Sequence, residues 1–202
     1  MFITRSGAWI VMVALLMATP VYAQIIEWQS AQPAGGEQSG TDWAYFYYVE
    51  YGGGFARATA IVQSAPSSNT SSMDASIISA QSGSIRKDTR YRGLRVWVRA
   101  TYTTNGNVYA PSFSLYFSCH GKANVGGIVV DLGVRSHDLW WGTEYRPSNG
   151  AQLALDIPDW DGKSIIPVSR HAEARAKAAR TGSPAYVQAV TETTVAVWAE
   201  GY

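Results

Sequence analysis

The chain has 202 residues, with 16 basic and 15 acidic side chains and a formal net charge of +1. This balance argues against a general polyanion binder, because such proteins concentrate positive charge. Aromatic residues make up 12% of the chain and Cys119 is the single cysteine, so a β-rich fold is favoured and an intrachain disulfide is excluded.

The first 23 residues are typical of a cleavable export signal. Arg5 supplies positive charge, Ala8–Ala18 is a short apolar run, and Pro20 precedes the small-x-small sequence ending at Ala23. The run is too short to span a bilayer comfortably, and no second apolar run follows. We therefore expect cleavage after Ala23, a periplasmic or secreted protein, and no transmembrane segment after cleavage.

Residues 24–42 are rich in glycine, serine and proline, which predicts a flexible arm before a single β-rich domain at 43–202. The aromatic segment 43–51 alternates in the manner of a strand. Gly52-Gly53-Gly54 permits a sharp reversal, and Phe55–Gln63 is predicted to return beside the first strand.

The alternation from Leu94 to Thr103 predicts a strand with one apolar face. Asn105-Gly106 is typical of a tight hairpin turn, so residues 108–119 are predicted to pair with this strand. Further strands are expected at 128–134 and 151–157, with a turn at 147–150 between them.

One segment, Ser169–Arg180, predicts an α-helix. Ser169 can cap its start, Glu173 and Lys177 are spaced for an ion pair, and Gly182 follows its end. A long strand or hairpin is expected at 185–198. The predicted fold class is therefore mainly β, an antiparallel sheet or β-sandwich with one covering α-helix near the C-terminus.

The sequence contains no complete catalytic or metal-binding motif, so we assign no catalytic residue, metal or cofactor, and favour binding over catalysis. Cys119 and His120 are adjacent, and neighbours on a strand point to opposite faces. Because Cys119 lies in an apolar strand, we expect its thiol to be buried, with an intermolecular disulfide as the alternative.

Aromatic residues gather near carboxylates in the second half of the chain. Aromatic faces stack on sugar rings, and a facing pair of carboxylates can hydrolyse a glycosidic bond. The candidate ligand-binding residues are Trp140, Trp141, Tyr145 and Trp160, and the neighbouring carboxylates are Asp138, Glu144, Asp156 and Asp159. The competing explanation is that these aromatics belong to the core and the sheet surface.

Arg95, Trp97 and Arg99 share one face of a predicted strand within a basic stretch. Such a face can bind a polyanion, or it can form an internal cation–π ladder. Export and the balanced charge favour the internal ladder, so we expect no nucleic-acid partner.

Residues 110–119, APSFSLYFSC, resemble the Arg-Pro-x-Leu-x-x-x-Cys strand of small periplasmic proteins associated with type VI secretion, and invasion-associated periplasmic proteins share a related strand. Trp160-Asp161-Gly162-Lys163 and the elements after it follow the same order. The resemblance covers about residues 90–200, although Ala110 replaces the usual Arg and a second cysteine is missing. It implies a non-enzymatic, β-rich accessory protein of the envelope.

Taken together, these patterns predict an exported envelope accessory protein that acts as a non-catalytic binding or scaffolding module. Its expected partner is another envelope or secreted protein, or a glycan. One alternative is a carbohydrate-binding or carbohydrate-active module that uses the tryptophan-rich site. Another is a surface or phage-like structural protein whose tyrosine-rich strand, with Tyr45, Tyr47 and Tyr51, contacts a partner.

Overall fold

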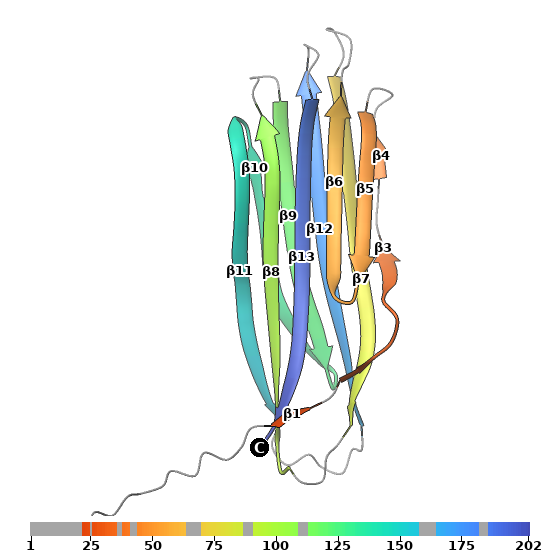
Figure 1. The fold of residues 1–202 in the computed structure, drawn as a ribbon, viewed down its shortest axis with the longest axis vertical. Helices are drawn as coiled ribbons and strands as arrows, with labels where there is room; N and C mark the ends of the chain where they lie inside the picture. The colour runs from red at the N-terminus through yellow and green to blue at the C-terminus, as the bar shows by residue number, and fades with distance from the viewer. Residues whose placement is uncertain are drawn as a thin grey trace, which may run out of the picture.

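The computed structural model of the chain describes residues 22–24, 26–35, 38–40, 44–63, 70–86, 91–108, 113–157, 165–181 and 186–202. In this part of the chain every helix or strand is a β-strand, and the strands lie in two layers along the long axis of the molecule (Figure 1). The strands are β1 (Tyr22–Gln24), β2 (Ile26–Trp28), β3 (Gln32–Gly35), β4 (Gln38–Gly40), β5 (Ala44–Gly52), β6 (Phe55–Gln63), β7 (Thr70–Arg86), β8 (Leu94–Val108), β9 (Phe113–Val125), β10 (Ile128–Leu139), β11 (Gly142–Ile157), β12 (Ile165–Thr181) and β13 (Tyr186–Gly201).

The two layers are antiparallel sheets. Sheet A has the strand order β11-β8-β13-β6-β5, and β1 also pairs with β13. Sheet B has the order β10-β9-β12-β7-β2, and β3 and β4 also pair with β7. Segments far apart in the chain are therefore neighbours in both sheets.

The topology is that of a jelly roll, the double-sheet architecture built from two Greek keys. From β6 onward the chain crosses between the sheets at almost every step, and only β9 and β10 are consecutive strands of one sheet. The last two strands, β12 and β13, each lie in the middle of their sheet. The fold is an all-β sandwich.

The predicted covering helix at 169–180 is wrong, because this segment is part of strand β12 between β9 and β7. A period of two places four of the five alanines of the segment on one face, which a helix of period 3.6 does not do. Arg175 on the opposite face pairs with Asp74 of β7, with 2.9 Å between Arg175 Nε and Asp74 Oδ1. The side chains that point inward are fully buried: Ala172, Ala174, Ala176 and Ala178.

The predicted hairpin at Asn105-Gly106 is also wrong. β8 continues through both residues to Val108, and β9 lies in the other sheet. Gly106 serves close packing: a Cβ at this position would lie 2.5 Å from Leu115 Cδ1 and 2.8 Å from Phe117 Cζ. Because no larger side chain fits there, the glycine marks a close approach between the sheets.

Sheets A and B end on the same side of the sandwich in two irregular strands, β11 and β10 (Figure 1). The pairing of β10 with β9 shifts register between Asp131 and Val134, and that of β11 with β8 shifts between Asn149 and Gln152. The turn predicted at 147–150 is therefore an irregularity within one strand. Such bulges make an edge strand a poor template for the addition of another chain.

The predicted hairpin around Gly52-Gly53-Gly54 is confirmed: β5 pairs with β6, and Gly54 has a φ of 84° that favours glycine. β5 is the last strand of sheet A, and the side chains of Tyr45, Tyr47 and Tyr51 lie outside the described part. The segment 24–42, expected to be a flexible arm, contributes β2, β3 and β4 to sheet B.

Residues 1–21 of the predicted export signal lie outside the described residues. β1 spans the predicted cleavage point, and its Ala23 lies opposite Glu200 of β13. Among the described residues, no helix is long and apolar enough to cross a membrane.

Candidate functional site

The outer face of sheet A carries three rows of side chains that cross the strands. One row joins Thr143, Asn107 and Gln188, taken from β11, β8 and β13 in turn. The next row joins Tyr145, Asn105 and Val190 in the same strand order. These positions share a face because alternate residues of each strand point to the same side of the sheet.

The third row lies next to Asn105 along β8 and carries charge. Thr103 of β8 lies opposite Glu192 of β13, and Glu192 lies opposite Arg57 of β6. Arg57 Nε and Glu192 Oε1 are 3.2 Å apart, and both side chains are about one third exposed. Among the described residues that line this site, the one arginine and the one carboxylate therefore neutralise each other.

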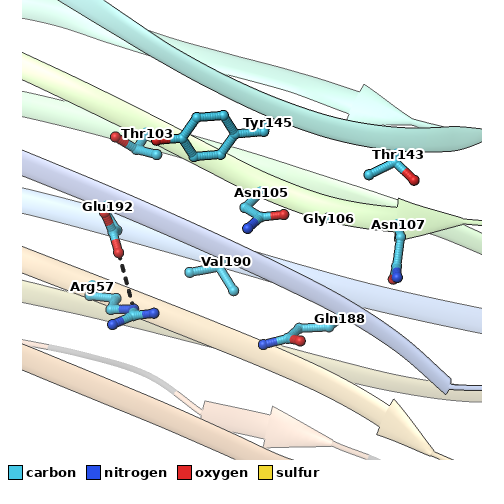
Figure 2. A pocket seen from close by; sticks show the side chains of 10 residues that line it. All are labelled: Arg57, Thr103, Asn105, Gly106, Asn107, Thr143, Tyr145, Gln188, Val190 and Glu192. Atoms are coloured by element: carbon cyan, nitrogen blue, oxygen red, sulfur yellow. Dashed lines mark ion pairs between the residues drawn. The ribbon is translucent and has the colours of Figure 1, made fainter.

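These rows surround a hollow of about 380 Å³, which we name the sheet A hollow (Figure 2). Its lining comes from four strands, so no local sequence motif contains it. The lining residues are Arg57, Thr103, Asn105, Gly106, Asn107, Thr143, Tyr145, Gln188, Val190 and Glu192.

The lining of the sheet A hollow combines amides and hydroxyls with a small apolar area. Val190 is 7% exposed and lies between the polar side chains in Figure 2, whereas the Tyr145 side chain is 66% exposed. Asn107 Oδ1 is buried and accepts no hydrogen bond from any residue that the structure describes. An unpaired buried acceptor is costly, and a ligand hydroxyl or amide that donates to it removes that cost.

A buried polar cluster on the inner face supports the β11 wall of the hollow. Glu144, between Thr143 and Tyr145, is 4% exposed, and Thr104 Oγ1 donates to its Oε1 over 2.7 Å. The Nε2 of His137 contacts the same oxygen, and Arg146 Nε lies 3.2 Å from Oε2. The Thr104–Glu144 bond joins β8 to β11 directly beneath the hollow, because it lies between the residues that line it.

The candidate carboxylates do not form a facing pair in the described part of the chain. Asp138 lies on the outer face of sheet B, Glu144 lies between the sheets, and Asp156 lies on the outer face of sheet A. A hydrogen bond from Arg95, 2.6 Å from Nε to Oδ1, lowers the pKa of the Asp156 carboxyl. Asp159 lies outside the described residues.

The structure brings one of the four candidate aromatic residues into the hollow. Tyr145 lines it. Trp140 and Trp141 form the turn between β10 and β11, where they are 66% and 63% exposed. Trp160 lies outside the described residues.

The basic strand face at Arg95, Trp97 and Arg99 lies farther along β8 and is occupied by internal contacts. The Arg95 guanidinium lies 5.9 Å from the centre of the Trp97 ring, and Trp97 Nε1 donates to Glu200 over 3.1 Å. The Trp97 ring stacks on that of Trp198, with 6.1 Å between centroids. Arg99 donates to Asn149 Oδ1 over 2.7 Å. These contacts have the form of an internal ladder.

Cys119 and His120 point to opposite faces of β9. Cys119 is 1% exposed on the inner face, and burial raises the pKa of its thiol to about 11. His120 lies on the outer face, where its Nε2 is 2.9 Å from Asp131 Oδ1. An intermolecular disulfide at Cys119 therefore requires β9 to open, because the buried thiol is out of reach of another molecule and its raised pKa keeps it protonated.

The residues that line the sheet A hollow, apart from Tyr145, are ones that the sequence analysis missed. The cause is the Asn105-Gly106 pair, because its turn propensity predicts that the strand ends before it, whereas β8 continues to Val108. The signal that identifies the strand is the alternation of Thr103, Asn105 and Asn107 with buried residues up to Val108. Arg57, Gln188 and Glu192 reach the site through sheet topology alone.

The fold and this face define a jelly-roll β-sandwich with a polar hollow on one outer surface. No family model matches the chain, and no curated protein matches it. The chain is similar to TmCBM61, solved in complex with β-1,4-galactotriose, at 13% identity and a TM-score of 0.17, covering 81% of this chain and 88% of that one.

It is also similar to the family 11 carbohydrate-binding module from Clostridium thermocellum, solved with a β-1,3-1,4-mixed-linked tetrasaccharide, at 12% identity, a TM-score of 0.21 and coverage of 79% and 95%. A third similar structure is the enzymatically active domain of bacteriophage CBA120 tailspike protein 4, at 11% identity, a TM-score of 0.18 and coverage of 85% and 19%. At these TM-scores the similarities carry no argument, so function is inferred from the chain's own residues.

Proposed function

We propose that the sheet A hollow binds an uncharged sugar unit, and that the protein is a non-catalytic glycan-binding module. The observation that carries this proposal is the convergence of three amide side chains, an exposed tyrosine ring and the unpaired Asn107 Oδ1 on one small hollow. The amides come from Asn105, Asn107 and Gln188.

A sugar ring matches this lining because it has apolar C–H faces and a rim of hydroxyl groups. Each hydroxyl both donates and accepts hydrogen bonds, and each amide offers an acceptor oxygen and two donor hydrogens. The Tyr145 ring and Val190 provide the apolar surfaces for the C–H faces. A predominantly apolar ligand fits this lining poorly, because it would leave the amides without partners.

The charge of the lining favours a neutral sugar over a uronic or sulfated one. Arg57 is the cation of the lining, and its ion pair with Glu192 offsets its charge. An anionic ligand has to compete with Glu192 for this guanidinium. A neutral ligand leaves the ion pair in place and accepts or donates hydrogen bonds at its edges.

The non-catalytic part of the proposal rests on the carboxylates. Glycoside hydrolysis uses two of them on either side of the bond that breaks. Among the described residues that line the hollow, Glu192 is the one carboxylate, and Arg57 holds it. The export signal expected at residues 1–23 supports action in the periplasm or outside the cell, as does the resemblance to envelope accessory proteins.

A second candidate function, binding of an envelope or secreted protein, is favoured by a different surface. Ile128, Val129 and Ile165 are exposed at the end of sheet B where β10 and β12 begin. Exposed aliphatic side chains near one end of a sheet offer apolar surface to a protein contact. A Val129→Lys substitution that abolishes co-purification of a stoichiometric partner, with glycan binding unchanged, would favour this candidate.

The test of the proposed function is a glycan array followed by calorimetry on Tyr145→Ala, Asn105→Ala and the control Val134→Ala. Val134 is an exposed apolar residue on β10, outside the hollow. We expect neutral glycans to bind in preference to uronic and sulfated ones. We expect each hollow variant to lose about 2- to 12-fold in affinity, since one stacking contact or hydrogen bond is worth about 0.5–1.5 kcal/mol, and the control to be unchanged. The site would be refuted if Tyr145→Ala and Asn105→Ala bound the glycan as tightly as the control and the unaltered chain.

A further inference from the structure

We infer that the glycan is an oligosaccharide whose chain continues beyond the sheet A hollow onto the exposed rings of Trp140 and Trp141. The inference rests on the proposed function and assigns a second binding area to it. We call the two rings the tryptophan lip.

The tryptophan lip is continuous with the hollow through β11. Gly142, with a φ of 94°, turns the chain into β11, and Thr143 and Tyr145 then line the hollow. Two steps between neighbouring Cα atoms place the Cα of Trp141 within about 7.6 Å of the Cα of Thr143. An indole side chain covers much of such a distance, so a ligand that fills the hollow extends next to the lip.

The two rings lie outside the hydrophobic core of the described residues. Leu139 is the last side chain of β10 that packs against the core, and neither tryptophan belongs to the core cluster. Two neighbouring tryptophans that are each about two thirds exposed leave a large apolar surface in water. A ligand with repeated C–H faces covers such a surface without needing a shaped cavity.

In the opposite direction along β8, the first tryptophan among the described residues is Trp97. Trp97 lies eight positions before Asn105 on β8, about 26 Å away at the rise of a strand. Its ring already stacks on Trp198, and its indole nitrogen donates to Glu200. The chain of the glycan therefore leaves the hollow on the β11 side.

The experiment compares monosaccharides with oligosaccharides of the same sugar. Methyl glycosides of glucose, galactose and mannose, and the linear tetrasaccharides of each, are titrated into the full chain and followed by ligand-observed NMR. The variants are Trp140→Ala, Trp141→Ala and their double variant, with Tyr145→Ala for the hollow and Val134→Ala as the exposed apolar control.

For at least one sugar, we expect the tetrasaccharide to bind more tightly than the methyl glycoside. Each lip variant should reduce that advantage about 2- to 12-fold, the range for one aromatic stacking contact, and leave the methyl glycoside unchanged. Tyr145→Ala should weaken both ligands. Val134→Ala should change neither.

Two outcomes overturn the inference while the proposed function stands. In one, the double lip variant keeps the full tetrasaccharide advantage while Tyr145→Ala still weakens the methyl glycoside. In the other, the lip variants weaken the methyl glycoside as much as the tetrasaccharide, so the rings belong to the hollow itself. Failure of every sugar to bind the unaltered chain overturns both the proposed function and the inference.

Discussion

Gly106 provides a sharp test of how closely the two sheets approach. An alanine Cβ at this position would lie 2.5 Å from Leu115 Cδ1, 2.8 Å from Phe117 Cζ and 3.0 Å from Gln188 O. Leu115 and Phe117 are both fully buried, so neither has free space to move into. Overpacking of this kind costs about 1–3 kcal/mol.

A second contribution to the free energy of unfolding acts in the opposite direction. Replacing glycine by alanine reduces the conformational entropy of the unfolded chain and stabilises a compatible site by about 0.4–1 kcal/mol. The net expectation for Gly106→Ala is a loss of about 1.3 kcal/mol in the free energy of unfolding, from the middle of the two ranges, with about 2.6 kcal/mol as the upper end. Gly52 is the matched control: a Cβ there meets nothing within 4 Å, so Gly52→Ala should be neutral or stabilising.

The assay is urea unfolding followed by tryptophan fluorescence, with a double-variant cycle. Leu115→Ala alone should cost about 2–5 kcal/mol, because it leaves a cavity. In Gly106→Ala/Leu115→Ala the new methyl group enters that cavity, so the double variant should cost about 1–3 kcal/mol less than the sum of the single variants. Additivity within about 0.5 kcal/mol would refute the reasoning.

Three further predictions concern other parts of the sandwich. Burial raises the pKa of the Cys119 thiol from 9.0 to about 11, so its contribution to stability is complete below pH 9 and is lost as the pH rises to 11. Between pH 8 and 11 the unaltered chain should therefore lose about 2 kcal/mol more than Cys119→Ala, at about 1.4 kcal/mol for each pKa unit and with the folded-state titration half complete at pH 11, and parallel urea-unfolding profiles would contradict this. Gly54→Ala should cost about 2 kcal/mol or more in thermal unfolding, because Gly54 has a φ of 84° and its Cβ would collide with Val195 O. Trp97→Ala should lower the melting temperature, because the ring stacks on Trp198 and donates to Glu200, and it should leave glycan affinity unchanged; lost affinity at an unchanged melting temperature would count against the internal ladder.

Local sequence pattern was sufficient to predict the structure where the residues of one strand or turn determine it by themselves. The alternation from Leu94 to Thr103 predicts the first part of β8, and Gly52-Gly53-Gly54 predicts the β5–β6 turn. In both places chain periodicity and turn chemistry agree, so no distant contact is needed to decide between structures.

Local pattern failed where propensity and periodicity disagree. Alanine favours helices, and this preference misled the interpretation of 169–180. In the structure the inner alanines of β12 let the two sheets pack closely, and alternation decides the structure. Asn105-Gly106 failed for a related reason: its glycine is required by Leu115 and Phe117 of the other sheet, which lie far along the chain.

The candidate site was largely beyond local reasoning. Tyr145 was identified by composition, but its partners Arg57, Asn105 and Glu192 are spread over 136 positions of the chain and come together through strand order. Strand order in a jelly roll depends on which sheet each strand enters, and turn residues do not encode that choice.

The central position of the last strands has a consequence for biogenesis. β13 separates β8 from β6 in sheet A, and β12 separates β9 from β7 in sheet B, so neither layer can close before the C-terminal residues are available. At synthesis rates of about 5–20 residues per second, the growing chain remains open for most of its time on the ribosome. Pairings between distant segments also form slowly. A translocation channel that accepts only extended chains would therefore meet this polypeptide before its sheets are complete.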